Sequence, residues 1–178
     1  MKKAAYLKQK NRLTKKSEAE YKTFNFTNKT ILALDQASNT GWCIIRDNKI
    51  IEFGCIQKKY DHFYINAVNT MVELAKLRTE YTPDILFFED IYLGMNVNVM
   101  EKLAGLKGMI MYFCEVNKLE YECIKSNSWK SYHGIAGERT AQKNESVQKV
   151  KELIGKEVTN DESDAILLGI FAVKTLRR

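Results

Sequence analysis

Apolar and polar positions divide the chain after residue 28 into short strands and longer helices. Residues 30–35 (TILALD) are a continuous apolar run that ends in an acid, which predicts a buried strand. Residues 40–46 and 49–57 are two apolar segments joined by the polar pair Asp47 and Asn48, which predicts a hairpin. Together these three segments predict an antiparallel meander.

The rest of the chain alternates between helical and strand patterns. Residues 84–89 (DILFFE) are a second apolar run that ends in acids, directly after the only proline, Pro83. Residues 119–124 (LEYECI) alternate in the manner of a short strand. Helical patterns cover residues 62–81, 97–116, 140–154 and 161–176. The order β-β-β-α-β-α-β-α-α predicts a mixed α/β sheet with helices on its faces.

The positive charge of the chain is concentrated in its first 28 residues. The 178 residues carry a net charge of +6, and residues 1–28, with eight Lys or Arg and two Glu, account for all of it. We therefore expect a basic, flexible extension over residues 1–28 and a single domain over residues 29–178. The extension either contacts nucleic-acid phosphates or is a solvated leader, and the sequence leaves both interpretations open.

Several classes of protein and site have little support. The chain has no run of about 18 uninterrupted apolar residues, as a membrane-spanning helix needs, and its lysine-rich start lacks the apolar core of a secretory signal. We therefore expect a cytoplasmic protein. The four cysteines show no CxxC spacing, so we expect reduced, structural cysteines. His62 and His133 form no metal-binding pattern, so a histidine-based metal site has little support.

Two acids stand at the ends of predicted buried strands. Asp35 and Glu89 each follow a run of large apolar residues, and no arginine lies near either in sequence. A carboxylate in such a place is costly to desolvate unless a positive group compensates it. A divalent cation would be such a group. Each acid alone is also explained by a position just beyond the strand, in solvent.

A second pair of acids opens the last predicted helix. Asp161 and Asp164 are three residues apart, which places both carboxylates on one helical face. Taken alone, acids in a first helical turn are ordinary capping chemistry. Together with Asp35 and Glu89, they provide enough oxygen ligands for two Mg²⁺ or Mn²⁺ ions. Two such ions about 4 Å apart serve the in-line hydrolysis of phosphodiesters.

The order of these motifs resembles the RuvC-type Holliday junction resolvases, which are ribonuclease-H-like nucleases. DQASNTGW (residues 35–42) resembles the family's first motif, an aspartate that ends a strand before a Ser/Thr-Gly turn. Glu89 resembles its second acid, and NDESDAILLG (residues 160–169) resembles its closing D-x-x-D-A helix. SWKSYHGIAG (residues 128–137) and Lys143 resemble the basic stretch before that helix. The resemblance covers residues 30–175.

This resemblance implies a ribonuclease-H-like α/β fold with a mixed five-stranded sheet. The first three strands form an antiparallel meander, the later strands are parallel, and helices flank the sheet. The resemblance also implies a homodimer that uses two Mg²⁺ or Mn²⁺ ions per site to cut four-way and other branched DNA in recombination, repair or phage DNA processing. By matching position, four acids are implied to bind the metal ions and to take part in catalysis, namely Asp35, Glu89, Asp161 and Asp164. Two lysines, Lys130 and Lys143, are implied to take part in catalysis and to contact DNA. The implied DNA-binding residues are Tyr92, Ser38 and Thr40.

The chain departs from the family pattern after the first acid. Gln36 and Ala37 stand where the family usually has Pro-Gly, and the spacing to the Thr-Gly pair is one residue shorter. Residues 1–28 match nothing in the family pattern. This divergence suggests a phage or prophage version. Asp90 and Glu162 directly adjoin assigned acids, so an assignment shifted by one residue stays open.

Other functions also stay open. A ribonuclease-H-like RNA-processing nuclease would use the same carboxylates. A non-catalytic branched-DNA-binding protein would keep the fold, although the retention of four acids argues against it. An actin-like ATPase opens with a similar acid-ended strand but needs a second such domain. Independently of the resemblance, the helix predicted over residues 97–116 is apolar on more than one face, which favours a dimer or deeper burial.

Overall fold

Five strands form one mixed sheet in the order β3-β2-β1-β4-β5. The structure, a computed structural model, describes residues 29–91 and 96–175. The first three strands are antiparallel neighbours, and β4 and β5 continue the sheet parallel to β1. The prediction of a mixed five-stranded sheet is confirmed. The strands are β1 (Thr30–Asp35), β2 (Thr40–Arg46), β3 (Lys49–Ile56), β4 (Ile85–Glu89) and β5 (Glu120–Ile124).

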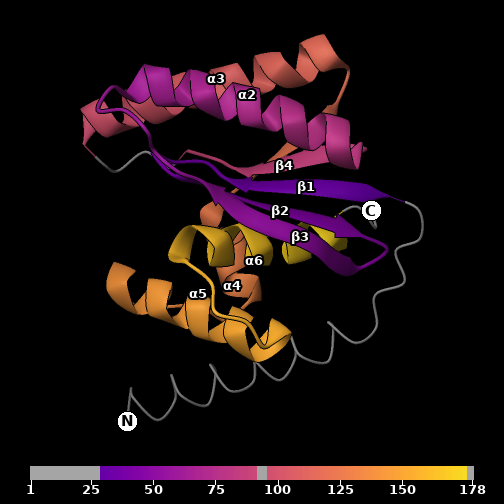
Figure 1. The fold of residues 1–178 in the computed structure, drawn as a ribbon. Coiled ribbons are helices and arrows are strands. Elements are labelled where there is room, and N and C mark those ends of the chain that lie inside the picture. Colours follow the sequence, from indigo (N-terminus) through magenta and orange to yellow (C-terminus); the bar gives the residue numbers. More distant parts are fainter. Residues whose placement is uncertain (1–28, 92–95, 176–178) are drawn as a thin grey trace.

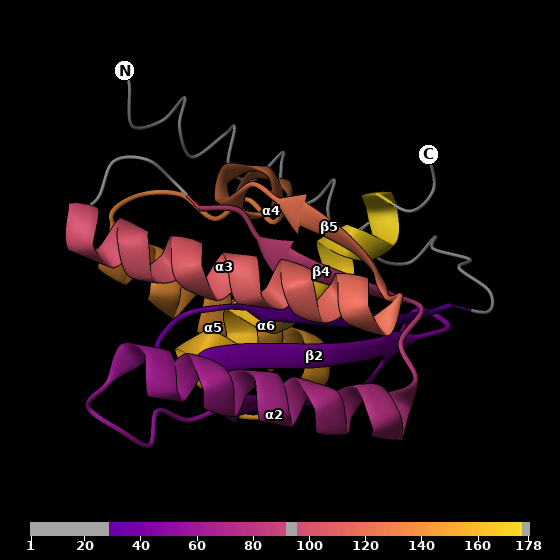
Figure 2. The same cartoon turned by 90° about the horizontal axis from the view of Figure 1, so that it is seen from above.

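Helices cover both faces of the sheet (Figure 1). α2 and α3 lie side by side on one face, as the view from above also shows (Figure 2), and α4, α5 and α6 lie on the other. The helices are α2 (Phe63–Tyr81), α3 (Val97–Asn117), α4 (Ser126–Tyr132), α5 (Arg139–Ile154) and α6 (Asn160–Thr175). Helix α4 was not predicted, because its seven residues are too few for a helical apolar pattern to repeat.

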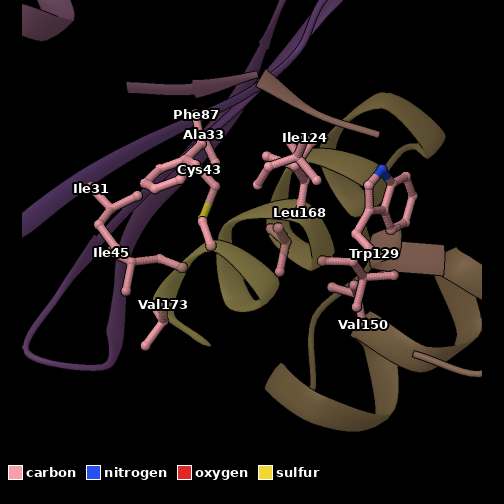
Figure 3. Close-up of a cluster of buried hydrophobic side chains, with 14 of the residues drawn as sticks. Ile31, Ala33, Cys43, Ile45, Phe87, Ile124, Trp129, Val150, Leu168 and Val173 are labelled. Atoms are coloured by element: carbon pink, nitrogen blue, oxygen red, sulfur yellow. The ribbon is translucent and has the colours of Figure 1, made fainter. Parts of the chain in front are cut away.

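The central strands are apolar throughout because both of their faces are buried. Successive residues of a strand point to opposite faces. In β1, Ile31 and Ala33 therefore join the core beneath α5 and α6, whereas Leu32 and Leu34 join the core beneath α2 and α3. Figure 3 shows the first of these cores, in which Trp129 of α4 also takes part. The direction of every strand-end side chain follows from this alternation.

Left-handed backbone positions occur at the predicted turn between β2 and β3 and at the ends of α2 and α3. Asp47 and Asn48 have φ values of 51° and 62° and connect β2 to β3. Two such residues in a row match the right-handed twist of a hairpin, and Asn and Asp tolerate the conformation better than most residues. Thr82 and Lys118 end α2 and α3 with φ values of 46° and 52°.

α6 lies unusually close to the sheet. A Cβ atom placed on Gly169 would lie 2.9 Å from Ile45 Cδ1 and 3.1 Å from Ala33 Cβ, so only a glycine fits there without displacement. The helix thus packs directly against β1 and β2 in the middle of the sheet. This close packing positions the first turn of α6 relative to the strand ends.

Some expectations concern parts of the chain outside the described residues. Both the basic extension over residues 1–28 and Tyr92 lie there. Within residues 29–91 and 96–175, no helix has the length and apolar character needed to cross a membrane. All four cysteines are free, as expected.

Alanine at two helical glycines should have opposite effects on stability. Gly108 of α3 is exposed and an added Cβ would meet nothing within 4 Å, so Gly108→Ala should raise the free energy of unfolding by about 1 kcal/mol through helix propensity. Gly169→Ala offers the same propensity gain but overpacks the core, which costs roughly 1–3 kcal/mol. Urea denaturation of both variants tests this. Equal stabilisation by both would contradict the close approach of α6.

Candidate active site

Asp35 and Glu89 end neighbouring parallel strands. The β1–β4 pairing runs to Leu34 and Phe88, and the two acids are the next residues on each strand. Parallel neighbours lie about 5 Å apart. Strand alternation directs Asp35 to the same face as Ala33, and Glu89 to the same face as Phe87, which is the face covered by α6. The two predicted strand-end acids therefore lie side by side on one face of the sheet.

The first turn of α6 lies directly against the strand pair beside Asp35. Gly41 of β2 is paired with both Asp35 and Cys55. A Cβ on Gly41 would lie 1.9 Å from the carbonyl oxygen of Asp161, so this contact requires glycine. The Oδ2 atom of Asp161 lies 3.8 Å from Cys55 Sγ. Asp161 is thus placed over the row formed by Asp35, Gly41 and Cys55.

Asp164 lies one turn further along the same face of α6. The hydroxyl of Ser146, a buried residue of α5, is hydrogen-bonded to this carboxyl. The Oδ1 atom of Asp164 is buried and has no hydrogen-bond partner among the residues that the structure describes. A buried carboxylate oxygen without a partner is costly, and it points to a ligand.

Helix α4 supplies the partners of Glu89. The indole Nε1 of Trp129 donates a hydrogen bond of 3.0 Å to Glu89 Oε2, and the hydroxyl of Ser126 bonds to the same carboxyl. Trp129 is itself fully buried, so its indole holds the carboxylate in a fixed orientation. The ammonium group of Lys130 lies 5.1 Å from the centre of the Trp129 ring.

The two adjoining acids have other partners. Asp90 forms an ion pair of 2.5 Å with Lys107 of α3, and its backbone N–H donates to Ile124. Glu162 accepts hydrogen bonds from both the backbone and the hydroxyl of Thr159, at 2.7 Å and 2.9 Å, which is a helix-capping arrangement. Asp90 and Glu162 therefore have local partners that compensate their charges, and Glu89 and Asp164 stay the predicted members of the site.

Three of the four acids, Asp35, Glu89 and Asp164, are electrostatically destabilised as anions. Burial raises the pKa of Asp35 well above its usual value, and the charges of Glu89, Asp164 and Asp161 raise it further. Burial also raises the pKa values of Glu89 and Asp164. We call Asp35, Glu89, Asp161 and Asp164 the carboxylate cluster.

The predicted lysines lie within electrostatic reach of this cluster. The charge of Lys130 lowers the pKa values of Asp35, Glu89 and Asp164, although burial outweighs it in each case. Lys143 of α5 acts in the same direction on Asp164. Both lysines are partly exposed, so their ammonium groups remain available to an anion at the site.

The predicted DNA-contacting residues differ in exposure. Ser38 is exposed in the turn after β1. Thr40 is fully buried, and its hydroxyl donates to the carbonyl oxygen of Ala37. In this structure Thr40 stabilises the turn, and Ser38 is the one of the two that a DNA strand can reach.

The donor chemistry of the cluster fits a hard divalent cation. Four carboxylates, including the unpartnered Oδ1 of Asp164, converge on one edge of the sheet, and oxygen donors are what Mg²⁺ and Mn²⁺ prefer. Within residues 29–91 and 96–175, no three His, Cys, Asp or Glu side chains are already close enough together to enclose an ion. The residues of the site therefore fit the metal chemically, and their side chains would need to close around it.

Sequence reasoning missed the residues that hold the carboxylates in place. Trp129, Ser126 and Ser146 contact the acids through bonds that span between 18 and 40 residues of chain. The amide of Gln36 bonds to the backbone of Glu89 on the next strand. The only available signal was the tryptophan in the stretch that resembles the family's basic motif.

Comparisons with known proteins identify the family of the chain. A family model described as Crossover junction endodeoxyribonuclease RuvC matches residues 31–172. The Crossover junction endodeoxyribonuclease RuvC of Orientia tsutsugamushi (strain Boryong) is 28% identical over 144 residues, which cover 76% of this chain and 89% of that protein.

Two solved structures share the fold. The chain is similar to Thermus thermophilus RuvC in complex with Holliday junction substrate, with a TM-score of 0.68 and 11% identity, covering 84% of this chain and 96% of that one. It is also similar to the yeast mitochondrial Holliday junction resolvase, with a TM-score of 0.57 and 14% identity, covering 96% and 92% of the two chains.

The stability of the protein without divalent cations should fall as the pH rises. A carboxyl whose pKa is raised by folding binds its proton more tightly in the folded state, so the folded state gains stability as the pH falls toward the unfolded pKa near 4. Asp35→Asn should therefore flatten the fall and raise the free energy of unfolding at pH 7, by about 1.4 kcal/mol for each unit of raised pKa. Urea titrations in EDTA between pH 4 and 8 measure this.

Asp61 provides the control for this experiment. It is exposed, and Lys58 lowers its pKa, so Asp61→Asn should leave the fall in stability with rising pH in place. Loss of stability at pH 7 in Asp35→Asn would show that Asp35 is a structural residue.

Proposed function

Because the chain belongs to the crossover junction endodeoxyribonuclease RuvC family, we propose that it is a divalent-metal-dependent endonuclease that cuts four-way and other branched DNA. The match to the family model over residues 31–172 confirms the family and the enzyme class that the sequence indicated. The observation that carries the metal mechanism is the convergence of the carboxylate cluster beside Lys130. The biological setting we propose is cytoplasmic recombination, repair or phage DNA processing.

In this proposal the carboxylate cluster holds one or two Mg²⁺ or Mn²⁺ ions. Bound ions supply the activation of a water molecule and the stabilisation of charge on the phosphate. Trp129 and Ser126 hold the carboxylate of Glu89, and Ser146 holds that of Asp164. Lys130 and Lys143 neutralise the scissile phosphate, because their ammonium groups already act on the same carboxyls. The attacking water forms a bond to phosphorus as the bond to the leaving oxygen breaks.

Branched DNA is favoured over RNA as the substrate by the relatives. One structure of the same fold holds a Holliday junction substrate, and another is a mitochondrial Holliday junction resolvase. A non-catalytic binding role is disfavoured by the arrangement of the acids, since the charged forms of Asp35, Glu89 and Asp164 reduce stability without a ligand. Tyr92 remains our candidate for stacking on a junction base, and Ser38 our candidate for a backbone contact.

We also propose a homodimer, because a four-way junction is two-fold symmetric and each chain supplies one carboxylate cluster. The layer of α2 and α3 offers the surface. Ile65, Val68 and Val72 of α2 are 49%, 55% and 50% exposed, and their spacing places them along one stripe of the helix. Tyr112 of α3 is 71% exposed. We infer that a second copy covers this apolar layer.

Asp35→Asn and Asp164→Asn should each abolish cleavage while leaving junction binding largely intact, because the amide keeps the shape of the carboxylate but not its charge. The measurement is a cleavage panel of four-way junction, fork, flap, linear duplex and RNA–DNA hybrid, with EDTA, Mg²⁺ or Mn²⁺. Glu162→Gln is the matched control, since Glu162 adjoins the cluster but caps α6. Full activity in Asp35→Asn would exclude the proposed mechanism, and preferential cutting of the hybrid would identify an RNA-processing enzyme.

Val68→Glu should convert the dimer to a monomer at micromolar concentration, because a charge in the centre of an apolar interface is strongly unfavourable. Analytical ultracentrifugation of the full chain measures the change. Leu153→Glu is the control, since Leu153 is 45% exposed on α5, across the sheet. A wild-type monomer, or a dimer that survives Val68→Glu, would rule out the α2 stripe as the interface.

A further inference from the structure

The side chain of Gln36 occupies the place of a backbone peptide group where β1 and β4 separate. Its Oε1 atom accepts a hydrogen bond of 3.1 Å from the backbone N–H of Glu89, and its Nε2 atom donates to the carbonyl oxygen of the same residue. The main-chain pairing of the two strands runs only to Leu34 and Phe88. Gln36 is 8% exposed, so these bonds are shielded from water.

A primary amide is the side-chain group suited to this position. Glu89 presents one donor and one acceptor toward β1, and a partner must supply one acceptor and one donor in the same plane. Among neutral side chains, only those of Asn and Gln offer both in the arrangement of a peptide group. The side chain of Gln36 thus adds one further rung to the β1–β4 ladder.

This rung joins two acids that repel one another. Gln36 directly follows Asp35, and the residue that it holds is Glu89, whose charge raises the pKa of Asp35. Repulsion between the carboxylates favours separation of the two strand ends. Other contacts of Glu89 involve α4 and its backbone pairing with β5. At the carboxyl ends of the two strands, only the contacts of Gln36, among those described, join β1 and β4 beyond the ladder.

We propose that Gln36 is a positioning residue that sets the separation of Asp35 and Glu89 and thereby the affinity of the carboxylate cluster for divalent cations. This inference rests on the proposed function for the role of the cation. The hydrogen bonds that carry it do not depend on that function. In this proposal Gln36 acts through the backbone of Glu89, to which both of its amide hydrogen bonds are made.

Two substitutions separate the hydrogen bonds of Gln36 from its volume. Gln36→Met keeps the length of the side chain and removes both bonds. Gln36→Asn keeps the amide but shortens the side chain by one methylene group, and it serves as the test if the methionine variant does not fold. Gln57→Met is the matched control, because Gln57 is an exposed glutamine just after β3.

The experiment has three measurements on the full chain. Hydrogen exchange of the Glu89 amide without metal should be at least about tenfold faster in Gln36→Met, because a protected amide loses its acceptor. The affinity for Mn²⁺, measured by calorimetry, should fall about 10–100-fold, the usual loss when a residue that orients a metal ligand is removed. In junction cleavage kcat should fall while KM stays unchanged. Gln57→Met should behave as wild type in all three.

The outcomes are distinguishable. Wild-type exchange of the Glu89 amide and wild-type Mn²⁺ affinity in folded Gln36→Met, or in Gln36→Asn if only that variant folds, would overturn the proposal. Faster exchange with unchanged Mn²⁺ affinity would overturn it as well, because the rung would then have no effect on the site. If wild-type protein neither binds Mn²⁺ nor cuts junctions, the proposed function fails, and the role of Gln36 at a metal site fails with it. The exchange rate would still report the rung itself.

Discussion

The close contact between α6 and the middle of the sheet is the constraint on which both the core and the active site depend. It requires glycine at two points, Gly169 against Ile45 and Ala33, and Gly41 against the backbone of Asp161. Leu168 and Val173 of the same helix belong to the apolar core that it forms with the sheet (Figure 3). Because α6 packs so close to the sheet, its first turn lies at the carboxyl ends of β1 and β4. Its acids then face those of the strands.

The same contact brings together charges that weaken the fold. Burial and mutual repulsion raise the pKa values of Asp35 and Asp164, so the folded state disfavours their charged forms. Lys130, the hydroxyl of Ser146 and the positive end of the α6 dipole offset part of this cost. The apolar core beneath α6 supplies the remaining stability. A site built in this way is stabilised by the ligand that it is built to bind.

The sequence predicted the strands, four of the helices and the edge of the sheet where the site lies. It could do so because an apolar run that ends in an acid indicates both a buried strand and the residue where the strand ends. The alternation of side chains along the strand then determines on which face of the sheet Asp35 and Glu89 lie. The sequence could not predict the short α4, nor the contacts of Trp129 and Gln36 with Glu89. Those contacts join residues that are 40 and 53 positions apart, and they depend on packing that no local pattern records. Tyr92 stays a prediction, since it lies outside the described residues.

Compensation of charge, rather than position in the sequence, separates the acids of the site from their neighbours. Glu89 and Asp90 are adjacent, and the sequence leaves open an assignment shifted by one residue. Asp90 faces the ammonium group of Lys107 at 2.5 Å, whereas burial outweighs every favourable contact of Glu89 and leaves its pKa raised. On α6, Glu162 is satisfied by Thr159, whereas Asp164 retains a buried oxygen without a partner. Acids that the fold leaves undercompensated at one edge of the sheet are the ones that a cation would complete, and this physical difference supports Glu89 and Asp164 over their neighbours as members of the proposed site.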